Sequence, residues 1–169
     1  MNYFEFYDIP ISLKIDEAQL KRTFYKNSKA YHPDFYTLST EDEKAAMLEQ
    51  SSLNNEAYKI LSDFDMRMKY VLDLFHSLAD EGKNTIPQDF LVDMMDINEG
   101  LMELEFEFDA AKFNTIIEEL ERLEKELYQD IAPIVEAFNP EKLEIVKKYY
   151  LKKKYLLRIR ENLLTFAVR

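Results

Sequence analysis

Histidine, proline and aspartate stand together at positions 32–34, and these three residues carry the most distinctive chemistry in the chain. The imidazole of His32 can donate or accept a hydrogen bond, and the carboxylate of Asp34 can pair with an arginine of another protein. Pro33 has a locked φ and restricts the residue before it, so it orients the turn that presents both groups. The pattern indicates a docking element at a surface turn, and the alternative is a chance tripeptide in a loop.

A basic amphipathic stretch precedes this tripeptide. Residues 16–31 contain four basic and two acidic side chains, in a chain whose net charge is −11. Leu20, Phe24 and Tyr31 define the apolar side of the predicted helix, and the cations fall largely on the other side. These cations are Lys21, Arg22, Lys26 and Lys29. The basic face predicts electrostatic attraction to an acidic partner surface.

Catalytic and metal-binding groups are not evident elsewhere in the sequence. The absence of cysteine excludes disulfides, thiolate metal sites and a cysteine nucleophile. His76 is predicted to be a surface or packing residue on the fourth helix, since a metal site needs further ligands. The acidic run at 103–109 lacks the glycine of a calcium loop, and the lysines at 152–154 balance an acidic protein. We therefore predict no enzyme activity, no metal and no cofactor.

The composition is typical of a compact helical protein. Of the 169 residues, 47% are hydrophobic and 33% charged, and only two are glycine. Helix-favouring residues are plentiful, and no run typical of a strand stands out, so we predict an all-α fold. The acidic net charge argues against nonspecific nucleic-acid binding. A signal peptide and a membrane-spanning run are not evident, so a cytoplasmic location is expected.

Apolar spacing and helix-capping residues predict seven helices and two domains. Asp16 is a candidate N-cap, Thr40 forms a capping box with Glu43, and Asn139 precedes a proline at the first helical position. Pro133 should kink or end the sixth helix. The predicted helices are 3–8, 17–31, 40–61, 65–78, 88–107, 110–137 and 141–166. The predicted domains are 1–78 and a three-helix bundle at 88–169, joined by a linker at 79–87.

Charge is distributed unevenly within the predicted bundle. Residues 89–136 carry fifteen acidic and three basic side chains, whereas residues 137–169 carry three acidic and nine basic ones. Such opposite charges favour packing of the acidic helices against the basic one, and the alternative is two solvated faces.

The first 78 residues resemble a J-domain, the module that stimulates DnaK-type chaperone ATPases. The residues that carry the resemblance are Tyr3 and Phe4, Leu20, Phe24, the run 31–34 and the run 53–63. The whole chain further resembles the HscB family of J-protein co-chaperones, which act in iron–sulfur cluster assembly. Residues 67–74 resemble the fourth helix of that family, and residues 90–101 resemble the first helix of its C-terminal three-helix bundle.

The resemblance implies two binding sites. The DnaK/HscA-type chaperone would contact His32, Pro33 and Asp34 together with the four cations of the basic face. An IscU-like iron–sulfur scaffold would bind an apolar patch on the bundle. Its matching positions here are Leu91, Val92, Met95, Asp96, Glu99, Tyr150 and Leu151. Residues 91–95 carry more apolar side chains than one narrow buried stripe needs, which favours an interface over plain core packing.

Two other functions remain open from the sequence. A J-protein could serve a different client, or the chain could be a helical hydrolase or a structural or metal-binding protein that uses its acidic helix. The sequence also departs from the family at position 35, where Phe35 replaces the usual basic residue and the following loop is about one residue shorter. This departure affects the detailed conformation of the turn and not the role of the tripeptide.

Overall fold

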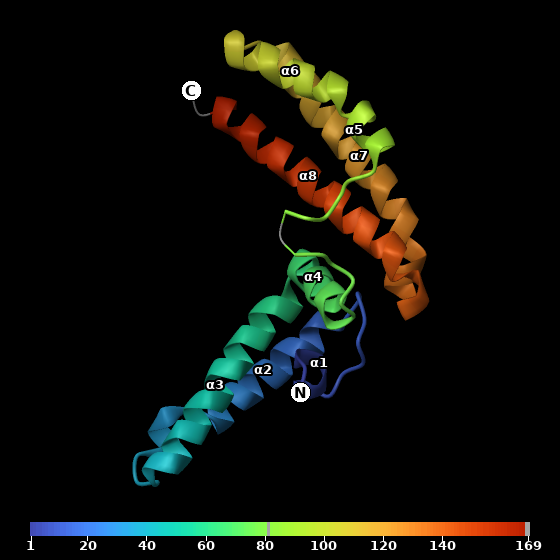
Figure 1. Ribbon diagram of the computed structural model, residues 1–169. Helices are drawn as coiled ribbons and strands as arrows, with labels where there is room; N and C mark the ends of the chain where they lie inside the picture. The colour runs from blue at the N-terminus through green and yellow to red at the C-terminus, as the bar shows by residue number, and fades with distance from the viewer. Residues whose placement is uncertain (81, 168–169) are drawn as a thin grey trace. The chain divides into compact units, whose positions relative to one another are not determined.

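The structure, a computed structural model, describes residues 1–80 and 82–167, and all regular secondary structure in these residues is helical (Figure 1). The all-α prediction is therefore confirmed. The chain forms two compact units, Met1–Val71 and Leu72–Arg169. The helices of the chain are α1 (Tyr3–Phe6), α2 (Glu17–Ala30), η1 (Pro33–Tyr36), α3 (Glu41–Ser62), α4 (Phe64–Leu74), α5 (Gln88–Asp93), α6 (Met95–Phe106), α7 (Ala110–Glu136), η2 (Pro140–Lys142) and α8 (Leu143–Ala167). The domain boundaries proposed from the sequence, with a linker at 79–87, stay a prediction.

The predicted caps begin the two long helices of the first unit. The Asp16 carboxylate accepts a hydrogen bond from the Gln19 backbone N–H at 3.0 Å. Thr40 and Glu43 form a reciprocal capping box, with hydrogen bonds of 3.2 and 3.1 Å. Because these bonds satisfy backbone donors that a helix leaves unpaired, α2 and α3 start where the sequence predicts.

The fourth helix ends four residues earlier than predicted, so His76 lies in a turn after α4 and not on the helix. The backbone N–H of Ser77 donates to the Leu72 carbonyl at 2.9 Å, and that of His76 donates to the Asp73 carbonyl at 3.0 Å. This pair of bonds is a Schellman motif, in which His76 adopts a positive φ of 52°. Glycine usually marks such an end, and its absence here explains the error.

A buried asparagine joins three helices of the first unit. Asn54 on α3 is 1% exposed, and its Oδ1 accepts hydrogen bonds from the Tyr7 hydroxyl at 2.8 Å and from Asn27 Nδ2 at 3.3 Å. Its Nδ2 donates to the Phe24 carbonyl and to Ser28 Oγ on α2. Every polar atom of this side chain is therefore paired, which fixes α2 against α3 without leaving a buried group unsatisfied.

Aromatic stacking and a buried cation complete the first unit. Phe24 of α2 stacks on Tyr58 of α3 with ring centroids 4.2 Å apart. Arg67, only 4% exposed, donates from Nε to the Leu13 carbonyl at 2.9 Å and from Nη1 to the Leu61 carbonyl. Arg67 thus satisfies a carbonyl at the end of α3 and anchors the loop before α2.

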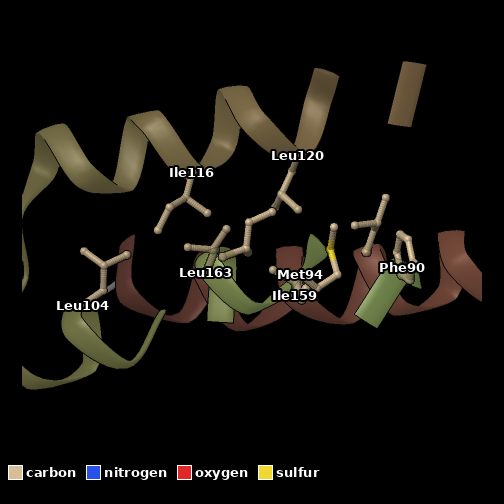
Figure 2. Packing of buried hydrophobic residues seen from close by; sticks show 9 residues of the cluster. Phe90, Met94, Leu104, Ile116, Leu120, Ile159 and Leu163 are labelled. Atoms are coloured by element: carbon tan, nitrogen blue, oxygen red, sulfur yellow. The ribbon is translucent and has the colours of Figure 1, made fainter. Parts of the chain in front are cut away.

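An apolar cluster is buried in the second unit (Figure 2). Phe90 of α5, Met94 between α5 and α6, and Leu104 of α6 meet residues of α7 and α8. The partners include Ile116, Leu120, Leu156, Ile159 and Leu163. The single helix predicted over 88–107 is wrong in one respect, because Met94 interrupts it with a ψ of −8°. This value lies well away from the usual helical ψ, so α5 and α6 are separate helices, although the Met94 N–H still donates to the Phe90 carbonyl at 3.1 Å.

The acidic and basic helices of the bundle pack against each other, as their charges predicted. α7 and α8 form an antiparallel pair, in which Arg160 Nη2 lies 3.0 Å from Glu124 Oε1. Asn139 caps η2 by accepting a hydrogen bond from the Glu141 N–H at 3.0 Å, and Pro140 takes the first helical position. Pro133 lies inside α7, which continues three residues further to Glu136, so the helix does not end at this proline, and the kink stays a prediction.

Replacement of Asn54 by alanine should lower the free energy of unfolding by about 2–4 kcal/mol. The change removes the acceptor of the Tyr7 hydroxyl and the donor to α2. Urea unfolding followed by circular dichroism measures the loss. The neighbouring exposed Asn55→Ala is the matched control and should change stability by less than about 0.5 kcal/mol. Equal effects of the two substitutions would contradict the role of Asn54.

Stability should also fall at alkaline pH because of Tyr7. Burial raises the pKa of the Tyr7 phenol above its ordinary value, so folding favours the neutral form. The stability that this form contributes is complete below the unfolded pKa of about 10 and is lost as pH rises toward the higher folded pKa. Unfolding of Tyr7→Phe should therefore depend less on pH between about 9 and 11 than unfolding of the parent chain.

The exposed Tyr25 provides the control for this measurement. Tyr25→Phe should keep the alkaline loss of the parent chain. If Tyr7→Phe shows the same loss as Tyr25→Phe, the buried phenol is not its source.

Candidate partner-binding sites

The turn between α2 and α3 presents the His-Pro-Asp residues at the surface. α2 ends at Ala30, and Pro33 opens the short helix η1 with His32 as its N-cap, at φ −65° and ψ 131°. That extended conformation is the one that proline imposes on the residue before it. The Tyr36 hydroxyl donates to the Ala30 carbonyl at 2.5 Å and ties η1 back to the end of α2. The interruption of the helix at position 33 therefore agrees with the sequence prediction.

The side chains of His32 and Asp34 point away from the core, with exposed fractions of 54% and 86%. His32 Nδ1 accepts a hydrogen bond from the Asp34 backbone N–H at 3.2 Å. This bond places the proton of the neutral imidazole on Nε2, so that nitrogen is the donor left for a partner. The Asp34 carboxylate lies 3.6 Å from His32 Nδ1, and its exposed oxygens can accept from a guanidinium.

The predicted basic face lies on the same helical hairpin. Lys21, Arg22, Lys26 and Lys29 are all exposed on α2. These residues and the turn that follows α2 belong to one unit and lie on consecutive elements. The structure thus combines a positive helix face with the two polar groups of the turn.

Apolar residues that the sequence analysis did not assign to a site surround the turn. Phe35 is 72% exposed and makes an edge-on contact with His32, with ring centroids 6.2 Å apart. A cleft of about 330 Å³ lies beside it, lined by Pro33, Met47 and Leu48 among others. The sequence feature that could have indicated this apolar surface is Phe35, which stands where the family usually has a basic residue.

The predicted scaffold-binding residues separate into exposed and buried positions. Val92 and Met95 are 55% and 64% exposed, and Asp96 and Glu99 are also exposed, whereas Leu91 is partly buried. Phe90 and Met94 lie in the core, so the apolar run 90–95 is partly core and partly exposed, and its role as an interface stays a prediction.

α8 lies next to this surface, but only one of its two predicted residues is accessible. The Tyr155 ring contacts the Phe90 ring at 5.7 Å, and Lys152 Nζ lies 5.7 Å from the centre of that ring. Tyr150 is partly exposed, whereas Leu151 is only 8% exposed. The prediction of Leu151 as a contact residue is corrected, because a side chain packed in the protein cannot reach a partner.

The acidic residues do not form a metal site in residues 1–80 and 82–167. In this range, three or more histidine, cysteine, aspartate or glutamate side chains do not converge on one point. Glu103 instead pairs with Lys112 across the α6–α7 turn. Among the same residues, we find no helix with the length and apolar character to cross a membrane.

Comparison with known proteins agrees with this architecture. Residues 86–164 match the family model described as the HSCB C-terminal oligomerisation domain. The human iron–sulfur cluster co-chaperone protein HscB is 29% identical over 164 residues, which cover 96% of this chain and 67% of the human protein. The crystal structure of human co-chaperone protein HscB superposes with a TM-score of 0.78 at 26% identity, over 98% of this chain and 81% of that structure.

The chain resembles the HscB family. A co-chaperone protein HscB homolog from Psychromonas ingrahamii is 32% identical over 100 residues, which cover 59% of each chain. The chaperone HscB from Vibrio cholerae shares the fold, with a TM-score of 0.69 at 21% identity, over 98% of this chain and 96% of that one. The HscB relatives are named as co-chaperones, and their similarity to this chain confirms the resemblance seen in the sequence.

Proposed function

We propose that this HscB-like chain is a J-protein co-chaperone that stimulates the ATPase of a DnaK/HscA-type chaperone and delivers an IscU-like iron–sulfur scaffold to it. The human relative is named as an iron–sulfur cluster co-chaperone. The observation that carries the proposal is the exposed His32-Pro33-Asp34 turn at the end of a rigid helical hairpin. Such a turn offers groups for docking and lacks a nucleophile paired with a base for catalysis.

The first surface binds the chaperone. The cations of α2 attract an acidic chaperone surface and raise the rate of encounter. His32 Nε2 then donates a hydrogen bond, and Asp34 pairs with a basic side chain of the chaperone. Pro33 holds both groups in place, so little conformational entropy is lost when they dock.

The second surface binds the scaffold. Its residues are Leu91, Val92, Met95, Asp96, Glu99 and Tyr150. The exposed methionine and valine supply apolar contact area, and the two carboxylates favour a partner with a basic rim.

The protein acts by bringing its two partners together, without catalysing a reaction and without a cofactor of its own. One surface holds the client, and the other favours the chaperone conformation that hydrolyses ATP. Such stimulation requires that the co-chaperone bind this conformation more tightly than the other. We place this activity in the cytoplasm, without nucleic acid or membrane as a partner.

His32→Gln and Asp34→Asn should each reduce ATPase stimulation to the basal rate of the chaperone. Both side chains are exposed, so the free energy of unfolding should change by less than about 0.5 kcal/mol. A single-turnover ATPase assay with candidate DnaK/HscA-type chaperones measures the effect. His76→Gln replaces the other histidine and is the matched control, with full stimulation expected. Retained stimulation by either variant of the turn would show that the docking role is wrong.

Leu91→Ala combined with Met95→Ala should weaken binding of the scaffold by roughly tenfold or more, since both residues supply apolar contact. ATPase stimulation measured without scaffold should stay unchanged. Calorimetry with an IscU-type scaffold gives the affinity. Leu48→Ala, which removes an exposed leucine of the other unit, is the control. A folded double variant with the affinity of the parent chain would rule out this binding surface.

A further inference from the structure

An exposed apolar stripe runs along the outer face of α6. Met95, Met102 and Phe106 are 64%, 71% and 93% exposed. They are spaced seven and four residues apart, so they lie on one side of the helix. Ile97 and Leu104 occupy the opposite side and are 5% and 2% exposed. We call Met95, Met102 and Phe106 the outer stripe.

The packing of α6 prevents the outer stripe from turning inward. Gly100 lies on the inner side, where a Cβ atom would meet Ile116 Cδ1 of α7 at 2.8 Å. The inner side of α6 therefore packs closely on the end of the Ile116 side chain, which would have to shift if a larger residue replaced Gly100. α6 also packs against α8, where Asn98 Nδ2 donates to the Tyr155 hydroxyl at 2.9 Å. The packing of α6 in the bundle therefore keeps the outer stripe exposed.

The outer stripe is flanked by hollows that can receive side chains of another protein. On the α7 side, a groove of about 950 Å³ is lined by Met102, Phe106, Phe108 and Lys112, among others. On the α8 side, a second groove of about 490 Å³ is lined by Met102, Leu101 and Phe166 with polar neighbours. Unbranched methionine side chains adapt readily to an incoming apolar surface.

The charges around the outer stripe define the kind of partner. Its exposed charged neighbours on α6 and the following turn are all acidic, and they are Asp96, Glu99, Glu103, Glu105, Glu107 and Asp109. Lys112 neutralises only Glu103 among them. A second copy that presented the same face would place carboxylates against carboxylates, which is unfavourable. A different protein with an apolar centre and a basic rim is complementary.

We propose that the scaffold-binding surface extends beyond Glu99 along the outer stripe, through Met102 and Phe106 to the α6–α7 turn. The inference rests on the proposed function and adds residues that the sequence did not assign to the site. Val92 and Met95 begin this surface, Glu99 follows one turn after Met95, and Met102 and Phe106 continue it to the end of α6. The scaffold accordingly presents an apolar strip flanked by basic side chains.

Calorimetry with an IscU-type scaffold tests the extension on the full chain. Met102→Ala combined with Phe106→Ala should weaken binding by roughly tenfold, and ATPase stimulation without scaffold should stay at the parent level. Met102→Gln combined with Phe106→Gln provides a second variant, which removes the apolar contact and makes this exposed face polar. Met66→Ala, at an exposed methionine of the first unit, is the control and should bind normally. Affinity of the parent chain should also fall as salt rises, because the rim contacts are ionic.

The outcomes separate this proposal from the proposed function. Normal affinity of both variants of the outer stripe, together with weak binding of the Leu91 and Met95 variant, would overturn the extension alone. Normal affinity of all these variants would overturn the scaffold surface as a whole. Sedimentation of the parent chain as a dimer, with the Met102 and Phe106 variant monomeric, would show that a second copy covers the outer stripe and would overturn the proposal.

Discussion

The first unit depends on the end that Pro33 imposes on α2. Proline lacks a backbone N–H and disfavours helical backbone in the preceding residue, so the chain must leave the helix at His32. The chain then returns as α3, and Asn54 locks the two helices together through a fully paired hydrogen-bond network. A rigid hairpin results, and its turn displays an imidazole and a carboxylate in fixed geometry. The proposed docking to a chaperone uses that fixed geometry.

The bundle of the second unit uses the two sides of α6 differently. The inner side carries Ile97, Gly100 and Leu104 and fixes the position of the helix against α7 and α8. The outer side carries exposed methionine and phenylalanine among carboxylates. In the proposed complex, burial of the outer apolar groups would be stabilising, and the carboxylates would favour a basic partner over a second copy of the chain. Core packing and the proposed recognition of the scaffold thus use opposite faces of α6.

Local signals predicted much of this architecture. Caps at Asp16 and Thr40, the proline at position 33 and the Asn139-Pro140 pair act through neighbouring residues, so their effects could be derived from the sequence. The end of α4 could not be predicted from the sequence, because its Schellman motif uses His76 where glycine is the usual signal. The roles of Asn54 and Arg67 were also missed, since their hydrogen-bond partners lie on other elements of the fold.

The sequence by itself determined the helical class, the helix starts, the polar turn and the opposite charges of the bundle helices. Only the tertiary structure decided which residues of the run 90–95 are buried, that Leu151 is inaccessible, and that the outer stripe of α6 remains exposed. Helical periodicity states which side chains share a face, but burial depends on which face meets a neighbouring helix. That choice is made by contacts between residues far apart in the chain, such as Gly100 with Ile116 and Phe90 with Tyr155.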